Sequence, residues 1–259
     1  MGLYPKTIFR YVGDRGLLLE FGDEISPEVN GKVRKMALAV RGAGPQGITE
    51  TVPTYRSLLV MYDPLLLPAG KLMESLEGLE EELEDLGRFS FPEGKVTRIP
   101  AVYGGPFGPD LEGVAGYLRI SPEEVVRLHC SRPYLIYMIG FMPGFPYMGE
   151  LPEALATPRL RTPRLSVPAG SVAIAQKQTG IYPIQSPGGW KIIGRTPVEL
   201  FDPEKTPPAL LQMGDYVEFY PITEKEFREW PAESSFRPDI PLPNNFNTIS
   251  LLGAVSYRK

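Results

Sequence analysis

The chain has 259 residues, 42% of them hydrophobic and 22% charged, which is typical of a globular protein with one large domain or two of ordinary size. Its net charge of −4 argues against a nucleic-acid-binding protein, and its single cysteine excludes an internal disulfide. Because no apolar run approaches the roughly 20 residues of a membrane helix and the N-terminal stretch lacks the pattern of a signal peptide, we expect a cytoplasmic protein that does not bind membranes.

The first hundred residues alternate between strand and helix patterns. Ser26 followed by Pro27 is typical of a helix N-cap, and the apolar residues that follow recur at helical spacing until Gly42. A second helix has leucines on one stripe and a densely acidic opposite face, which we expect to be solvated. The predicted elements are strand 16–21, helix 27–41, strands 48–55 and 57–63, helix 71–86 and strand 95–103. This β-α-β-β-α-β order predicts a ferredoxin-like domain over residues 1–98.

From Tyr103 onward, glycines and prolines separate short apolar runs. Ser121 and the glutamate three residues after it form the pattern of a capping box, which starts a short helix that ends near His129. The spacing of the later apolar runs predicts an all-β barrel or a closed sandwich over residues 99–230. A Pro- and Asn-rich C-terminal extension follows over residues 231–259. The predicted fold class is therefore α+β.

Four loops of the second half are unusually rich in Gly, Pro and aromatic residues. They are 140–149, 167–171, 179–183 and 186–190. Glycine lets a backbone approach another surface closely, proline stiffens it, and aromatic side chains supply apolar area. The loops therefore predict the wall of a pocket or a docking face. The alternative is a set of ordinary barrel turns packed by their own aromatic residues.

His129, the only histidine of the chain, is a candidate for proton transfer because histidine titrates near neutral pH. It lies near the end of a short predicted helix, whose dipole favours the protonated form. The alternative is a structural histidine. With one histidine, one cysteine and no carboxylate cluster at ligand spacing, we expect no metal site, and no Walker or Rossmann glycine pattern indicates a nucleotide site.

Arg159 and Arg164 lie in the near-repeat TPRLRTPR, and Arg195 follows in the sequence IGRTP. A guanidinium group matches the geometry of a carboxylate or phosphate, and the proline before each of the first two arginines fixes the local backbone. Three such cations among Gly-rich loops indicate an anionic ligand. The alternative is that each arginine pairs with a local acid, such as Glu150, Glu153 or Glu199.

The block HCSRPYLIYMIGFMPGFPYMGELPEALATPRLRTPRLSVPAGSVAIAQKQTGIYPIQSPGGWKIIGRTP (129–197) resembles the family of 5-oxoprolinase B subunits, also called allophanate hydrolase subunit 1, to which the kinase inhibitor KipI belongs. The segments YGGPFGPDL, VPTYRSLLVMYDP, GD-x-x-LLLEFG and MGD match the family too. The resemblance covers about residues 10–222.

The resemblance implies a ferredoxin-like domain followed by a cyclophilin-like β-barrel. It also implies a hetero-oligomer with the 5-oxoprolinase C subunit, which is KipA-like, acting together with the 5-oxoprolinase A subunit. Such a set converts 5-oxoproline to L-glutamate with ATP. ATP, with Mg, is then used by the A subunit, no cofactor is bound by this chain, and we expect the chain to be inactive alone. Phosphorylation of the lactam oxygen would create a leaving group and allow water to open the ring.

Within this resemblance, we assign catalytic or anion-holding roles to His129, Arg159, Arg164 and Arg195. Gln178 suits an amide-bearing substrate, although it could instead bond the backbone. The predicted substrate-binding residues are Gly144, Phe145, Tyr147, Gln178, Tyr182, Ser186, Gly188, Gly189 and Trp190.

Three other functions remain open from the sequence. A KipI-like protein would bind and inhibit a sensor histidine kinase. A carboxyltransferase part would need biotin on a carrier chain. Prolyl isomerisation would rest only on the likeness of the barrel to cyclophilin, which is a weak argument because one fold hosts many functions.

Overall fold

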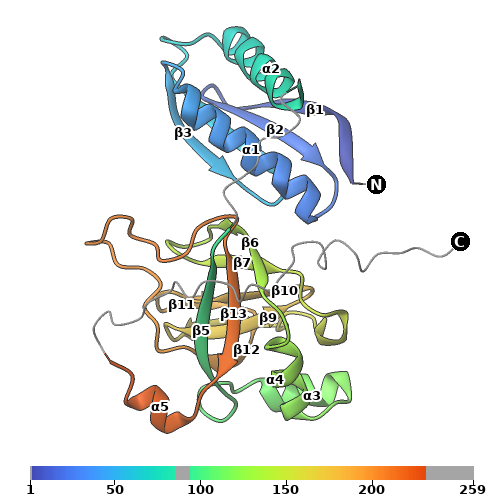
Figure 1. Cartoon of the computed structure of the whole chain (residues 1–259), viewed down its shortest axis with the longest axis vertical. Helices are drawn as coiled ribbons and strands as arrows, with labels where there is room; N and C mark the ends of the chain where they lie inside the picture. The colour runs from blue at the N-terminus through green and yellow to red at the C-terminus, as the bar shows by residue number, and fades with distance from the viewer. Residues whose placement is uncertain (1, 86–93, 232–259) are drawn as a thin grey trace, which may run out of the picture.

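The computed structural model describes residues 2–85 and 94–231, and Figure 1 shows them as an N-terminal unit stacked on a barrel unit. The residues of the predicted C-terminal extension from 232 to 259 lie outside the described residues. The N-terminal unit consists of β1 (Leu3–Val12), β2 (Gly16–Gly22), α1 (Pro27–Ala43), β3 (Ile48–Pro53), β4 (Ser57–Tyr62) and α2 (Ala69–Asp85). Its four strands form an antiparallel sheet in the order β1-β2-β4-β3.

Both helices of the N-terminal unit pack on the same face of this sheet. Alternate residues of β2 and β4 are buried with the apolar stripes of α1 and α2 in one core. Since alternate strand residues point to the same face, the two helices must cover that face together. The Ser26 side chain caps α1 by accepting a hydrogen bond from Val29 N, as predicted. The helix ends at the left-handed Gly44 (φ 53°), two residues later than expected.

One strand of the ferredoxin-like prediction is wrong. The strand assigned to the end of the N-terminal domain is β5 (Val96–Tyr103), and it pairs with β12 and β13 of the barrel. The fourth strand of the N-terminal sheet is instead β1, which pairs with β2. β1 was missed because most of its residues are exposed, so it lacks the inward apolar alternation of a central strand. The predicted division at residue 98 falls inside β5 and stays a prediction.

The barrel unit confirms the predicted β-barrel. Its strands are β5, β6 (Tyr134–Ile139), β7 (Pro146–Gly149), β9 (Ser171–Ala175), β10 (Gln178–Ile181), β12 (Lys191–Arg195) and β13 (Tyr216–Pro221), and its other elements are α3 (Leu111–Leu118), α4 (Pro122–His129), η1 (Glu153–Leu155), β8 (Arg164–Val167), β11 (Ser186–Gly188) and α5 (Glu224–Arg228). The barrel closes in the order β10-β7-β6-β13-β5-β12-β9, while β8 and β11 form a separate pair. Ser121 caps α4 as expected. The helix α3 was not predicted.

Hydrogen bonds from α1 tie the N-terminal unit to the barrel. The buried Asn30 places its side-chain nitrogen 3.1 Å from the carbonyl oxygens of Thr54, Tyr55 and Tyr137, the last of which belongs to β6. Arg34 donates a hydrogen bond to Gly214 O at 3.4 Å. A buried polar side chain is stable only when its hydrogen bonds are satisfied, so Asn30 fixes the position of the turn that carries Tyr55 against the barrel.

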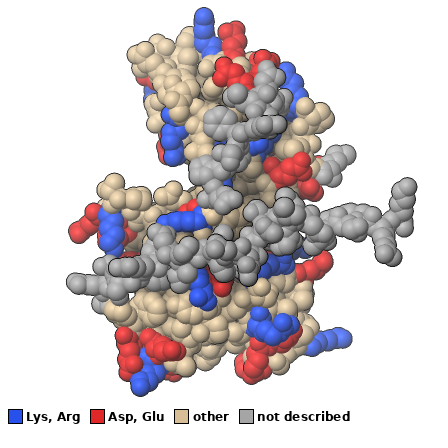
Figure 2. Space-filling model, in the orientation of Figure 1, with Lys and Arg blue, Asp and Glu red and all other residues tan. Residues whose placement is uncertain are grey.

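The surface gives no sign of segregated charge on the visible face. Figure 2 shows basic and acidic side chains interspersed over both units. Among the described residues, none of the helices is long and apolar enough to cross a membrane.

Candidate functional site

Four aromatic side chains from three of the predicted loops form one cluster beside the barrel, which we call the aromatic cluster. Phe145 is its centre, with ring centroids 4.8 Å from Tyr147, 5.1 Å from Tyr182 and 5.6 Å from Trp190. Phe145, Tyr182 and Trp190 are buried and Tyr147 is half-buried. The tilted and edge-to-face geometry is the favourable one for aromatic pairs. The structure therefore brings these four predicted residues together into one rigid wall.

The glycines of these loops allow close packing around the aromatic cluster. A Cβ atom at Gly188 would lie 2.3 Å from the Tyr182 hydroxyl oxygen. At Gly144, whose φ is 79°, it would lie 2.9 Å from Phe201 Cβ. Gly189 accepts a hydrogen bond from Leu160 N at 2.8 Å, which anchors the loop before Trp190. These glycines therefore allow the loop backbone to lie close to neighbouring side chains.

Ser186 does not have the surroundings of a nucleophile. Its hydroxyl donates a hydrogen bond to the Pro187 carbonyl oxygen at 3.2 Å. A nucleophilic serine requires an adjacent base, and His129, the one histidine, lies inside the barrel. Ser186 is a strand residue next to the cluster, and it lies opposite Val167 in the β8–β11 pair.

Gln178 connects the aromatic cluster to the N-terminal unit. Its side-chain nitrogen donates a hydrogen bond to the Tyr55 hydroxyl oxygen at 2.5 Å. The Tyr55 ring in turn lies 5.7 Å from Tyr147 and 5.8 Å from Tyr137. Nothing in the sequence indicates Tyr55, because the pattern around a turn residue of the first unit does not show that it reaches the second.

Arg159 is the predicted arginine that lies against the aromatic cluster. Its guanidinium carbon is 5.9 Å from the Trp190 ring centroid, within the range of a cation–π interaction. The side chain is exposed, and no ion pair joins it to another residue of the described chain. Its charge lowers the pKa values of the neighbouring Tyr147 and Tyr182, against the larger raising effect of burial. Arg159 can therefore meet an anion or an acidic partner at the edge of the wall.

Arg164 has a different position from the one expected of a free anion holder. It makes two hydrogen bonds to the Asp110 carboxylate, Nη1 to Oδ2 at 2.9 Å and Nη2 to Oδ1 at 2.7 Å. Asp110 also accepts a hydrogen bond from Ile192 N at 2.7 Å. The acid that pairs with Arg164 is thus Asp110, and not one of the three glutamates considered from the sequence. This ion pair fastens β8 to the start of α3 and to β12.

Arg195 is engaged with the backbone of a predicted loop. Its Nε donates a hydrogen bond to Ala169 O at 2.8 Å, within the segment 167–171. Arg159, Arg164 and Arg195 therefore have three different partners: an aromatic ring, a carboxylate and a carbonyl oxygen.

His129 is fully buried inside the barrel, with both ring nitrogens in hydrogen bonds. Nδ1 lies 2.8 Å from the Tyr103 hydroxyl, and Nε2 lies 2.8 Å from Thr179 Oγ1. Thr179 gives its own proton to Ala173 O, so it accepts from Nε2, and Nδ1 then accepts from Tyr103. The neutral ring satisfies every group of this network.

The expectation that the helix end favours protonated His129 is wrong. Burial lowers the pKa of His129 to about 3, because the charged ring would be removed from water. The Tyr134 and Phe219 rings pack against it, and the Tyr134 hydroxyl donates to the His129 carbonyl oxygen at 2.7 Å. This environment is that of a structural histidine that organises the barrel interior.

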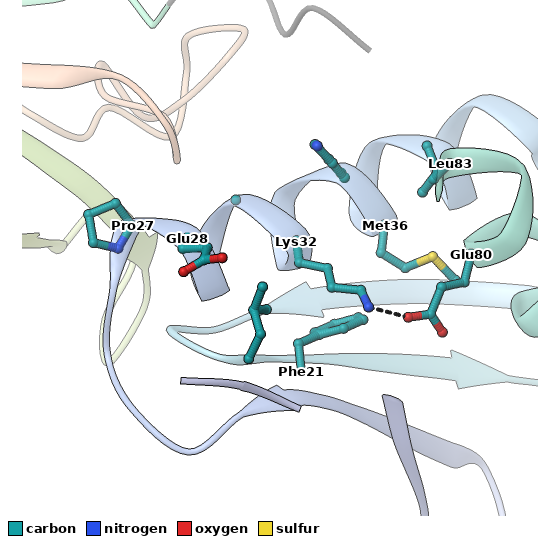
Figure 3. Close-up of a pocket in the computed structure, with 10 residues that line it drawn as sticks. Phe21, Pro27, Glu28, Lys32, Met36, Glu80 and Leu83 are labelled. Carbon is teal, nitrogen blue, oxygen red and sulfur yellow. Dashed lines mark ion pairs between the residues drawn. The ribbon is translucent and has the colours of Figure 1, made fainter. Parts of the chain in front are cut away.

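A cavity of about 520 Å³ lies in the N-terminal unit, between α1, α2 and the strands β1 and β2. Figure 3 shows Lys32 and Glu80 pointing toward each other across it, above Phe21. Their ion pair measures 2.6 Å, and the Glu80 side chain is only 15% exposed. The acidic face of the second helix is therefore not wholly solvated, since Glu80 turns inward to meet Lys32.

A second cavity of about 520 Å³ lies at the junction of the two units. Ile25 borders it from the N-terminal unit, and Tyr137 and Gln178 border it from the barrel. Of the predicted site residues, Gln178 alone lines this cavity. Gln178 bonds Tyr55, and Tyr55 packs on Tyr147, so the junction cavity lies beside the aromatic cluster. In the described parts of the chain, no group of three or more His, Cys, Asp or Glu residues could hold a metal ion.

Comparisons with known proteins add to this geometry. The sequence model described as carboxyltransferase domain, subdomain C and D, matches residues 7–211. A protein of Bacillus subtilis, named as the B subunit of 5-oxoprolinase, is 43% identical over 231 residues, a match that covers 86% of this chain and 96% of that protein. The protein of the same name from Escherichia coli O157:H7 is 40% identical over 213 residues, covering 82% of this chain and 95% of that protein.

A solved structure shares the fold. The crystal structure of TTHA0988 superposes with a TM-score of 0.72 at 40% sequence identity. The match covers 81% of this chain and 40% of TTHA0988, so the present chain spans less than half the length of that protein.

Proposed function

The chain belongs to the family of 5-oxoprolinase B subunits, and from this premise we propose that it works as the B subunit of an ATP-dependent enzyme that opens the lactam ring of 5-oxoproline to give L-glutamate. The observation that carries the proposal is the match to the Bacillus subtilis protein, which is 43% identical and covered over 96% of its length. In the overall reaction one water adds across the lactam C–N bond, and a second is consumed as ATP becomes ADP and phosphate.

The chain acts with other subunits in this proposal and is inactive alone. The A subunit, with Mg, uses the ATP, and the C subunit forms a complex with the present chain. TTHA0988 contains the equivalent of this chain within a longer polypeptide, of which the match covers 40%. A closed pocket shared between subunits would keep the activated lactam away from bulk water until it reacts.

The loops around the aromatic cluster supply the surface that meets the C subunit. Phe141, Leu165 and Ile184 are 66%, 92% and 39% exposed, and each lies in or beside a loop or strand that flanks the cluster. Phe141 also has a φ of 66°, a conformation that is uncommon for a residue with a side chain and recurs at functional sites. Exposed apolar side chains that form a contiguous patch are typical of a protein interface.

The arginines take separate roles. Arg159, at the edge of the aromatic cluster, meets an anionic group of the substrate or of the partner. Arg164 and Arg195 hold the loops in place through Asp110 and Ala169. His129 supports the barrel and takes no part in proton transfer.

The test is glutamate release from 5-oxoproline and ATP by the chain mixed with its A and C subunits, with each of the three proteins omitted in turn. We expect release only with all three. Turnover that persists without this chain would refute the proposal.

The kinase-inhibitor alternative is not favoured, because relatives with 40–47% identity are named as 5-oxoprolinase subunits.

The docking surface has a matched pair of variants. Leu165→Ser should weaken binding of the C subunit, while Leu65→Ser, at a position 90% exposed on the N-terminal unit, should not. Binding of the C subunit to both variants with the affinity of the wild type would place the interface elsewhere.

A further inference from the structure

The junction cavity has the size and position of a small-molecule site. Its volume of about 520 Å³ lies within the roughly 300–1,000 Å³ of ligand pockets, and such pockets often form between domains. Its barrel side includes the turn between β9 and β10, where Gln176 has a φ of 55°. This positive φ is the geometry of the two-residue hairpin turn that joins the two strands, and it holds the turn at the edge of the cavity.

Tyr137 gives this cavity an unusual chemical property. The residue lines the cavity and is 1% exposed, and its hydroxyl has no hydrogen-bond partner among the residues that the structure describes. Burial, and then the charge of Glu150, raise the pKa of Tyr137, so the hydroxyl remains protonated and can donate. Buried hydroxyls normally have a hydrogen-bond partner; the exceptions among the described residues are Thr97, Thr157 and Tyr137, of which Tyr137 alone lines the junction cavity.

The Tyr137 ring is held in place by its neighbours. A Cβ atom at Gly149 would lie 2.7 Å from the ring, so only glycine leaves room for it there. The Tyr55 ring packs against the ring from the N-terminal unit. The hydroxyl therefore keeps a fixed position at the junction of the two units.

Two other polar groups of the cavity complement this donor. Gln178 uses its side-chain nitrogen on Tyr55, which leaves its Oε1 atom as an acceptor without a partner in the described chain. Arg132 is exposed at the cavity and forms no ion pair with a described residue. Lys177 also borders the cavity, but it pairs with Glu153 at 3.4 Å.

We propose that the junction cavity binds a small cyclic amide that carries a carboxylate. The amide carbonyl oxygen accepts a hydrogen bond from Tyr137, the amide N–H donates to Gln178, and the carboxylate lies near Arg132. The site rests on the proposed function and adds to it the place where the lactam is held. It lies beside the aromatic cluster and requires both units of the chain.

The direct test measures binding of 5-oxoproline to the full chain by ligand-observed NMR or calorimetry. Tyr137→Phe removes one hydrogen bond and should weaken binding by about tenfold, whereas Tyr117→Phe, on the exposed face of α3, should leave it unchanged. 2-Pyrrolidinone, which lacks the carboxylate, should bind more weakly than 5-oxoproline. Replacing Arg132 by alanine should weaken the binding of 5-oxoproline and leave the binding of 2-pyrrolidinone unchanged.

A stability measurement separates ligand binding from a structural role of Tyr137. Since the hydroxyl is unsatisfied in the free chain, Tyr137→Phe should melt at the same temperature as the wild type or higher. Absence of 5-oxoproline binding to the folded chain, or equal affinity of wild type and Tyr137→Phe, overturns the proposed site.

The same variant in the assembled complex distinguishes the two proposals. An assembled wild-type complex without turnover would refute the enzyme function itself. Turnover with a KM for 5-oxoproline that Tyr137→Phe leaves unchanged would refute only the cavity. We expect turnover, and a KM raised about tenfold by the variant.

Discussion

The barrel interior around His129 and the junction around Tyr137 are both buried and rich in tyrosine, yet their hydrogen bonds differ. Around His129, both ring nitrogens and the Tyr134 hydroxyl have partners. At the junction, the Tyr137 hydroxyl has none among the described residues. A complete polar network stabilises a fold, while an incomplete one is costly until a ligand completes it. The comparison indicates that the histidine serves structure and the tyrosine serves binding.

The largest effect should follow from removing the centre of the complete network. His129→Ala loses a buried ring and two hydrogen bonds, so we expect the free energy of unfolding to fall by about 3–4 kcal/mol. Urea unfolding measures this change. Arg159→Ala is the control, since its exposed side chain should change stability by less than about 0.5 kcal/mol. A His129→Ala protein as stable as the wild type would remove the distinction between the two regions.

A pH titration sharpens the same distinction. The pKa of His129 falls from 6.5 to about 3 in the folded chain, so the unfolded chain binds the extra proton at intermediate pH. The contribution of His129 to stability is therefore complete above about pH 6.5 and is lost as the pH falls, by up to about 1.4 kcal/mol per unit.

The control for this titration is His129→Phe, which has no titrating ring. Between pH 6.5 and 5, its stability should fall less steeply than that of the wild type in urea unfolding. Identical slopes would mean that the folded histidine titrates like the unfolded one. With its lowered pKa, the folded His129 is neutral between pH 6 and 8, so we expect other groups to set the pH dependence of activity in that range.

Arg164→Ala should cost about 2 kcal/mol, because it leaves the half-buried Asp110 carboxylate with only its bond to Ile192 N. Thermal or urea unfolding measures the loss. Adding Asp110→Asn should recover part of it, since the unpaired charge is then removed. If Arg164→Ala instead abolishes turnover with full stability, Arg164 contacts the substrate, as its sequence pattern predicts.

The smallest effects should come from a matched pair of tyrosines. Tyr134→Phe removes a satisfied hydrogen bond to the His129 carbonyl oxygen and should cost about 1 kcal/mol. Tyr137→Phe removes an unsatisfied hydroxyl and should cost nothing. Equal losses in the two variants would show that Tyr137 already has a partner in the free chain.

Much of the local structure followed from the sequence. The caps at Ser26 and Ser121 and the apolar stripe of α1 depend only on neighbouring residues, so they could be predicted and are confirmed. The short apolar runs between glycines and prolines predicted a barrel or a closed sandwich, and the strand pairing of the structure is that of a barrel. The long block of residues 129–197 was enough to indicate the family.

The tertiary structure decided what local patterns could not. A strand pattern at 95–103 does not say which sheet the strand joins, and the barrel takes it while β1 completes the N-terminal sheet. Likewise, an arginine in a loop does not reveal that Asp110, 54 positions away, holds it.

The site shows the same division. The sequence by itself determined that aromatic residues, glycines and arginines gather in a few loops, because composition is local. Only the tertiary structure placed His129 beyond solvent and brought Tyr55 against Tyr137 across the two units. Burial and long-range contacts set the pKa of a histidine and the unmet hydrogen bond of a tyrosine, and neither is written in the spacing of neighbouring residues.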